Sequence, residues 1–450
     1  MKMTQVVGAK LSRWTLAYFT ASLAALLAAE ALVAGGLAYP AAPLFAPGSL
    51  VAVHVVTIGW LSLLMLGALH QFLPVIAARP LASDRLALAS LVLIETGLAA
   101  MIAGFLALGG IGAVVALLPL GGVSVLAGFL CAVANLGWTL RGVSPLPLPA
   151  RFIVAALGFL LLTALLGIGF GCAFVLPTPP RWLAALAAEG LALHLLAGIG
   201  GWFALTAVGV SYKLLPMFML AEEDRGRVGA VILWLTAGGL AAAWSAGVLA
   251  IIADPRWRLV AMTGEVAFAA GLGLYLWDMR RLYRSRHRRR LELNSLAAAA
   301  SMVPLALALV GGVAMRFAPN GTDWAAPLVL LTLLGWLSLL GLSQLYKIVP
   351  FLTWLERYAS RLGRGPVPRV QDLVNEARAW PWFALFALGT LVSTAAAALA
   401  APDVARLGAV LLFVSTLAIV RELLRARRVS PARASPGDLS KPLQHRESFR

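Results

Sequence analysis

Twelve long apolar segments limit what this chain can fold into more than any other feature of the sequence. Each is about 20 residues or longer, the length that an α-helix needs to cross the hydrocarbon core of a bilayer. Only 12% of the 450 residues are charged, whereas soluble domains carry about 25%. This composition excludes a soluble globular protein, and the length of the segments excludes the short strands of a membrane barrel. The sequence predicts an all-α polytopic membrane protein in a lipid bilayer.

The apolar segments form one transmembrane domain over residues 1–425. We expect the spans at residues 15–37, 50–76, 85–107, 111–137, 151–176, 186–218, 228–252, 257–278, 294–316, 325–353, 378–400 and 403–424. Residues 426–450 are basic and rich in Ser, Pro and Arg, which predicts a disordered cytoplasmic tail. The first apolar run is too long for a cleavable signal peptide.

The positive charges are distributed unevenly between alternate loops. Segment 280–290 carries seven arginines and segment 357–378 carries five, and the opposite loops carry only Arg181, Arg256, Arg258, Arg316 and Arg406. Because Lys and Arg concentrate on the cytoplasmic side, both termini are predicted to be cytoplasmic, in a plasma membrane of the bacterial inner-membrane type. This distribution also accounts for the net charge of +17 without a nucleic-acid partner.

One pattern occurs three times. The second span reads GWLSLLMLGALHQFLP, the sixth GWFALTAVGVSYKLLP and the tenth GWLSLLGLSQLYKIVP, so that Trp60, Trp202 and Trp336 stand at equivalent positions. Each interval between copies contains four spans. The sequence therefore predicts three parallel four-helix repeats, at about 14–140, 150–280 and 292–425, around a pseudo-threefold axis along the membrane normal.

The repeat aligns polar residues at the cytoplasmic ends of these spans. One set of equivalents is His70, Tyr212 and Tyr346, and the next is Gln71, Lys213 and Lys347. They are interpreted either as interface anchors that reach the headgroups or as a polar ring on a proton path.

Three histidines lie in apolar spans, where polar side chains usually mark function. His54 precedes Trp60 by six residues and His194 precedes Trp202 by eight, which places them within about 3 Å of one depth near the outer side. His54 and His70 are about 24 Å apart along one helix and cannot share a metal. We consider His54 and His194 candidate metal ligands and all three histidines candidate cofactor ligands. The alternative for each is a buried histidine that bonds to a neighbouring group.

Acidic residues also lie in predicted spans. Glu189 is five residues before His194, while Glu95 and Glu265 lie within the third and eighth spans. Such carboxyl groups suit proton relays or the pairing of a cation, and the alternative is a structural hydrogen bond between helices.

The arrangement of twelve helices, together with the stretch HVVTIGWLSLLMLGALHQFLP, resembles the catalytic subunit of heme–copper oxidases and nitric oxide reductases. In that superfamily the second, sixth and tenth helices carry metal ligands. By this resemblance His54 matches a heme ligand and His194 a ligand of copper or non-heme iron. Active members carry further histidines on helices seven and ten, whereas spans 228–252 and 325–353 have none. The resemblance thus implies the fold and a metal or heme site with fewer histidine ligands, without the full oxidase activity.

Two classes of function remain open. In the first, the protein binds heme b, copper or both at His54 and His194, with Glu189 orienting His194. It would act in electron transfer, in the response to nitric oxide or oxygen, or in respiratory metal handling, with a cytochrome or a copper protein as partner. In the second, it is a transporter or structural subunit without a cofactor that uses Glu95, Glu265, Lys213 and Lys347.

Overall fold

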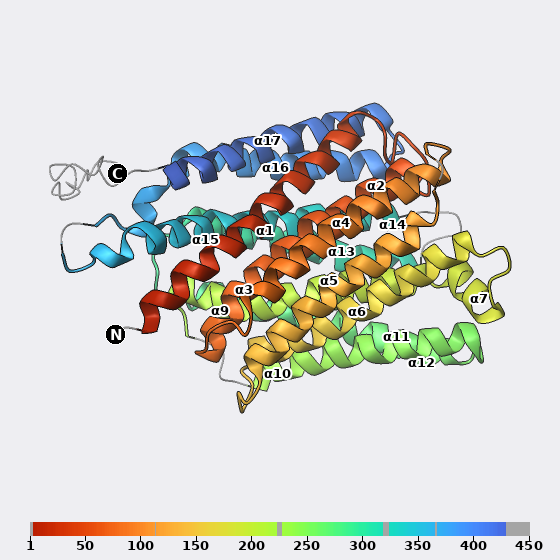
Figure 1. Ribbon diagram of the computed structural model, residues 1–450, viewed down its shortest axis with the longest axis horizontal. Coiled ribbons are helices and arrows are strands. Elements are labelled where there is room, and N and C mark those ends of the chain that lie inside the picture. The colour runs from red at the N-terminus through yellow and green to blue at the C-terminus, as the bar shows by residue number, and fades with distance from the viewer. Residues whose placement is uncertain (1–2, 113, 223–226, 318–323, 365–366, 429–450) are drawn as a thin grey trace.

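The structure is a computed structural model, and it describes residues 3–112, 114–222, 227–317, 324–364 and 367–428. Across these residues the regular structure is helical throughout, without a strand, and twelve helices are long and apolar enough to cross a membrane. The helices lie side by side along the long axis of the molecule (Figure 1). The prediction of an all-α membrane protein with twelve spans is confirmed at this level.

Eight spans are single helices and four are interrupted. The single helices are α1 (Met3–Ala34), α4 (Asp84–Leu108), α5 (Leu117–Leu140), α6 (Leu148–Val175), α12 (Trp257–Arg284), α13 (Leu293–Ala314), α16 (Glu376–Ala398) and α17 (Pro402–Arg428) in the described chain. The interrupted spans are α2 and α3 (Pro47–His54, Leu63–Ala77), α8 and α9 (Leu191–Leu195, Leu205–Met219), α10 and α11 (Arg227–Leu233, Gly239–Ile252), and α14 and α15 (Ala325–Leu330, Leu339–Arg357). Counted together, the eight single helices and four interrupted ones give the twelve spans.

Of the boundaries that differ from the prediction, two affect the interpretation of the chain. The sixth span was expected from residue 186, but α7 (Arg181–Glu189) is a separate short helix that ends at Gly190, and the span begins at Leu191. Glu189 therefore lies before the span. The tail was expected from residue 426, but α17 continues to Arg428, and the rest of the predicted tail lies outside the described residues.

Three spans form the centre of the bundle. In the second, sixth and tenth spans, 61%, 67% and 67% of the most apolar window is buried, compared with 22–44% in the other nine. The three tryptophans of the repeated pattern are the largest fully buried side chains. We call these spans the inner spans. A helix that is apolar on all sides is suited to a position surrounded by other helices.

Each inner span contains a π-helical segment at the same place in the pattern. The segments are η1 (Val55–Ser62), η2 (Leu196–Ala204) and η5 (Leu331–Ser338), and each includes the Gly-Trp pair. In η1 and η5 the final serine donates a hydrogen bond to the carbonyl five residues earlier, at 2.8 Å from Ser62 to Thr57 and 2.7 Å from Ser338 to Leu333. That spacing belongs to the π-helix, and π segments are frequent at functional sites.

Glycines allow close helix contacts at repeated positions. A Cβ on the glycine before each buried tryptophan would lie 2.8 Å from Ala25 at Gly59, 2.3 Å from Phe159 at Gly201 and 2.7 Å from Pro304 at Gly335. Each of these neighbours belongs to the span that precedes the glycine's own span. Small residues are what permit such approach in membranes.

A second set of glycines joins the spans that follow. Gly97 packs on Gly121, Gly239 on Gly264 and Gly389 on Gly408, with added Cβ atoms 2.7, 2.7 and 3.1 Å from the facing carbonyl oxygens. These contacts join α4 to α5, α11 to α12 and α16 to α17.

The two ends of the bundle differ. α1 begins and α17 ends at the left of Figure 1, where α3, α9 and α15 also lie, and α2, α7 and α14 lie toward the right. We call the left end the basic end, because it carries the arginine-rich segments 280–290 and 357–378, and the right end the opposite end.

Candidate functional site

The buried tryptophans are linked to serines of neighbouring inner spans. Trp60 donates from Nε1 to Ser338 Oγ at 2.8 Å, and Trp202 donates to Ser62 Oγ at 3.0 Å. Both serines are buried and close the π segments described above. The tenth span is thus bonded to the second, and the second to the sixth, at one level of the bundle.

The third tryptophan has no such bond. In the repeated pattern the position of Ser62 and Ser338 is occupied in the sixth span by Ala204, which lacks a hydroxyl. Trp336 Nε1 is buried and has no hydrogen-bond partner among the described residues. The sixth and tenth spans therefore meet at this level by packing alone.

His54 lies at the end of α2, directly before η1. Its Nδ1 is 2.7 Å from the carbonyl oxygen of Leu50, so Nδ1 carries the proton and donates. Its ring packs on Phe105 of α4, with ring centroids 4.8 Å apart. In this tautomer the lone pair of Nε2 is free, and a neutral imidazole binds a metal through such a lone pair.

His194 lies on α8, two residues before η2. Its ring packs on Phe170 of α6, with centroids 5.6 Å apart, and its Cε1 would be 3.2 Å from a Cβ on Gly167. Its Nδ1 is buried without a hydrogen-bond partner among the described residues. His54 and His194 thus each precede the π segment of an inner span, so both predicted site residues lie on the same side of the tryptophan level.

His70 lies away from this pair, on α3 toward the basic end. Both of its ring nitrogens are buried without a hydrogen-bond partner in the described part of the chain, and its ring is 5.4 Å from that of Tyr18. An unpaired buried polar atom costs about 1–3 kcal/mol. The structure does not join His70 to His54.

The predicted acidic residues do not gather around the histidines. Glu189 forms an ion pair with Arg258 at 3.3 Å, and its side chain is 55% exposed. The structure therefore pairs Glu189 with Arg258 and not with His194. Glu95 is exposed on α4, and Glu265 is partly buried on α12.

The aligned residues of the predicted polar ring have different surroundings. Tyr212 donates to Asp278 Oδ2 at 2.9 Å, whereas Tyr346 packs edge-on against Phe383. Lys347 forms an ion pair with Glu292 and lies over the ring of Phe218. Lys213 is partly buried on α9.

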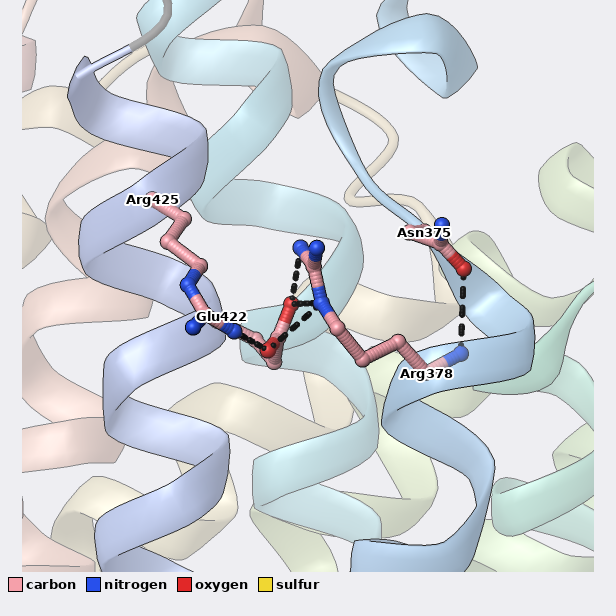
Figure 2. Close-up of polar contacts among 4 residues, drawn as sticks. All are labelled: Asn375, Arg378, Glu422 and Arg425. Atoms are coloured by element: carbon pink, nitrogen blue, oxygen red, sulfur yellow. Dashed lines mark hydrogen bonds and ion pairs between the residues drawn. The ribbon is translucent and has the colours of Figure 1, made fainter.

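Buried carboxylates of the basic end were missed in the sequence analysis. Asp278 accepts from Tyr212 and pairs with Arg281 at 2.9 Å. Glu422 is 4% exposed. Its two carboxylate oxygens share the N–H of Arg378 Nε, one of them also accepts from Arg378 Nη2, and the carboxylate pairs with Arg425 as well (Figure 2). The signal was present: an acid is followed by Arg three and six residues later both at Asp278 and at Glu422.

Comparison with known proteins gives no family. No protein-family model matches the chain, and no curated protein matches it. Within the described residues, no group of three or more His, Cys, Asp or Glu side chains is placed to hold a metal ion.

Proposed function

We propose that the twelve spans are three parallel four-helix repeats around a pseudo-threefold axis, as in the heme–copper oxidase and nitric oxide reductase superfamily. Three structural features that recur at equivalent positions support this proposal. They are the π segment with its buried tryptophan, the glycine before that tryptophan, and the glycine pair in the last two spans of each repeat. Helices related by a common ancestor retain such contacts because the backbones could not otherwise approach.

We further propose that His54 and His194 bind a copper ion between two inner spans. The observation that carries this proposal is the position of both histidines just before the π segment of an inner span, with the lone pair of His54 Nε2 left free by the bond from Nδ1 to Leu50. Neutral imidazoles suit copper. Zinc sites take three or four protein ligands, more than this pair supplies.

Each residue of this site would have a limited role. Leu50 fixes the tautomer of His54, and Phe105 and Phe170 cover the two rings and keep water from them. A bound copper would supply one-electron chemistry. The protein would then act in electron transfer, in the nitric oxide or oxygen response, or in respiratory metal handling, at a plasma membrane of the bacterial type with both termini in the cytoplasm. A cytochrome or a copper protein would be its partner.

Metal analysis and a reduced-minus-oxidised visible spectrum of the purified protein test this function. We expect about one copper per chain, lost in His54→Ala and in His194→Ala and retained in His70→Ala, which is the control because His70 is a buried histidine of the same inner span as His54. If the spectrum shows bands of heme b that disappear in His54→Ala, the ligand of His54 is heme and not copper. A protein with neither cofactor would contradict the proposal and favour the transporter.

The cofactor-free alternative has less support. It uses Glu95, Glu265, Lys213 and Lys347 as transport groups, but Glu95 is exposed on α4 and Lys347 is paired with Glu292. An ion pair at the basic end holds Lys347 in place rather than leaving its charge for a substrate.

A further inference from the structure

A small cavity lies where the three inner spans meet. Its volume is about 70 Å³, and its walls come from α3, α9 and α15, with Phe19 of α1 and Leu337 of η5. These helices follow the tryptophan level, so the cavity lies on the basic-end side of the Trp–Ser bonds. It is separate from the two histidines, which precede the π segments at the opposite end.

The residue sizes at one level of the repeat explain why space remains. Met65, Ala207 and Gly341 occupy equivalent positions in the pattern and all line the cavity. The three inner spans thus contribute a long side chain, a methyl group and no side chain at this level, and Leu64 packs beside Gly341, where an added Cβ would lie 2.6 Å from it. Neighbouring side chains relax only partly into such a gap, so a void persists.

The wall of the cavity is apolar. Most of the lining side chains are aliphatic, and the polar exceptions are Thr206, Ser211 and Gln344. Ser211 donates to the carbonyl of Ala207 at 2.6 Å. Thr206 Oγ1 and Gln344 Oε1 have no hydrogen-bond partner within the described part of the chain but are covered by neighbouring atoms, so they offer little to a molecule inside the cavity.

A water molecule in such a place would find few partners. Buried waters typically make about three hydrogen bonds, and cavities walled by carbon stay dry and take up small apolar molecules instead. The volume of about 70 Å³ is near half of the ~150 Å³ cavity that admits benzene or xenon. The occupant must therefore be smaller than benzene.

We propose that the cavity between the inner spans is a binding site for one apolar molecule of gas size that dissolves in the bilayer. Van der Waals contact with Leu64, Met65 and Leu340 holds the molecule, and burial of its surface drives binding. The site is independent of the copper proposed at His54 and His194.

Xenon is the probe for this site, with binding followed by xenon NMR on the full-length protein in detergent. Wild type is expected to show one saturable site above the background of xenon in the micelle. Ala207→Leu fills the cavity and should abolish that site, whereas Met65→Leu nearly conserves volume and should retain it. Ala68→Leu, from the same wall, is a second filling variant in case Ala207→Leu does not fold.

Two results would overturn the proposal. One is a wild type without a saturable xenon site, as expected for a cavity that is collapsed or filled with water. The other is undiminished binding in a folded filling variant, which would place the xenon elsewhere. Copper content, measured on the same samples, should not differ between these variants, so failure of this site is distinguishable from failure of the metal site.

Discussion

The inner spans are alike at the tryptophan level and unlike at the basic end. At the tryptophan level three π segments, three glycines and three buried indoles occupy matching positions, and a single residue, Ala204, breaks the pattern of hydrogen bonds. At the basic end the aligned residues His70, Tyr212 and Tyr346 each have different neighbours. The comparison teaches that the inner spans share residues where they pack closely against other helices, whereas the side chains at the basic ends of the same spans differ.

The largest expected effect comes from the glycine contacts that recur between the two spans after each inner span. A Cβ on Gly97 would lie 2.7 Å from the backbone of both Gly121 and Val125, and backbone cannot move aside as a side chain can. We expect Gly97→Leu to lower the free energy of unfolding by about 3 kcal/mol or to prevent folding. Gly158→Leu, where nothing lies within 4 Å of an added Cβ, is the matched control. Thermal unfolding of the two purified variants makes the comparison, and equal stability would show that the recurring contacts carry no weight.

The next effect sharpens the account of the basic end. Glu422 is buried between Arg378 and Arg425, whose side chains are about half exposed (Figure 2). Without the Glu422 carboxylate the two guanidinium groups lose their partner. We therefore expect Glu422→Ala to lower the free energy of unfolding by about 2 kcal/mol. Asp372→Ala, which removes the partner of the largely exposed Arg369, should cost much less. Chemical denaturation of both variants would measure the difference, and a larger loss in Asp372→Ala would contradict this account.

A smaller effect tests the broken position at the tryptophan level. Ala204→Ser restores the hydroxyl that the other two inner spans possess, and we expect it to raise the free energy of unfolding by about 1 kcal/mol through a bond from Trp336. The gain should vanish when Trp336→Phe is also present, because the donor is then absent. A gain that persists in the double variant would assign it to something other than this bond.

The smallest effect concerns the predicted partner of His194. Glu189 and Arg258 are both more than half exposed, and such ion pairs contribute about 0.2–1 kcal/mol. We expect Glu189→Gln to change stability within that range and to leave copper content as in wild type. A loss of copper in this variant would restore Glu189 to the histidine site.

Much of the fold follows from the sequence, because span length and the Gly-Trp pattern are local signals. Trp60, Trp202 and Trp336 could be aligned, yet the bond from Trp60 to Ser338 joins residues 278 apart in the chain. The π segments have no hydrophobic signature of their own. Asp278 and Glu422 were missed because they lie among arginines that indicate topology, and Glu189 was placed in a span because the break at Gly190 interrupts a continuous apolar run.

The central claim is that His54 and His194 together hold one copper ion. X-ray absorption at the copper edge counts the nitrogen ligands directly in the purified protein. The account predicts two imidazole ligands in wild type and the loss of one in a variant that retains weak binding, such as His194→Ala at raised copper concentration. A wild-type spectrum with a single imidazole, or one unchanged by His194→Ala, would contradict the claim.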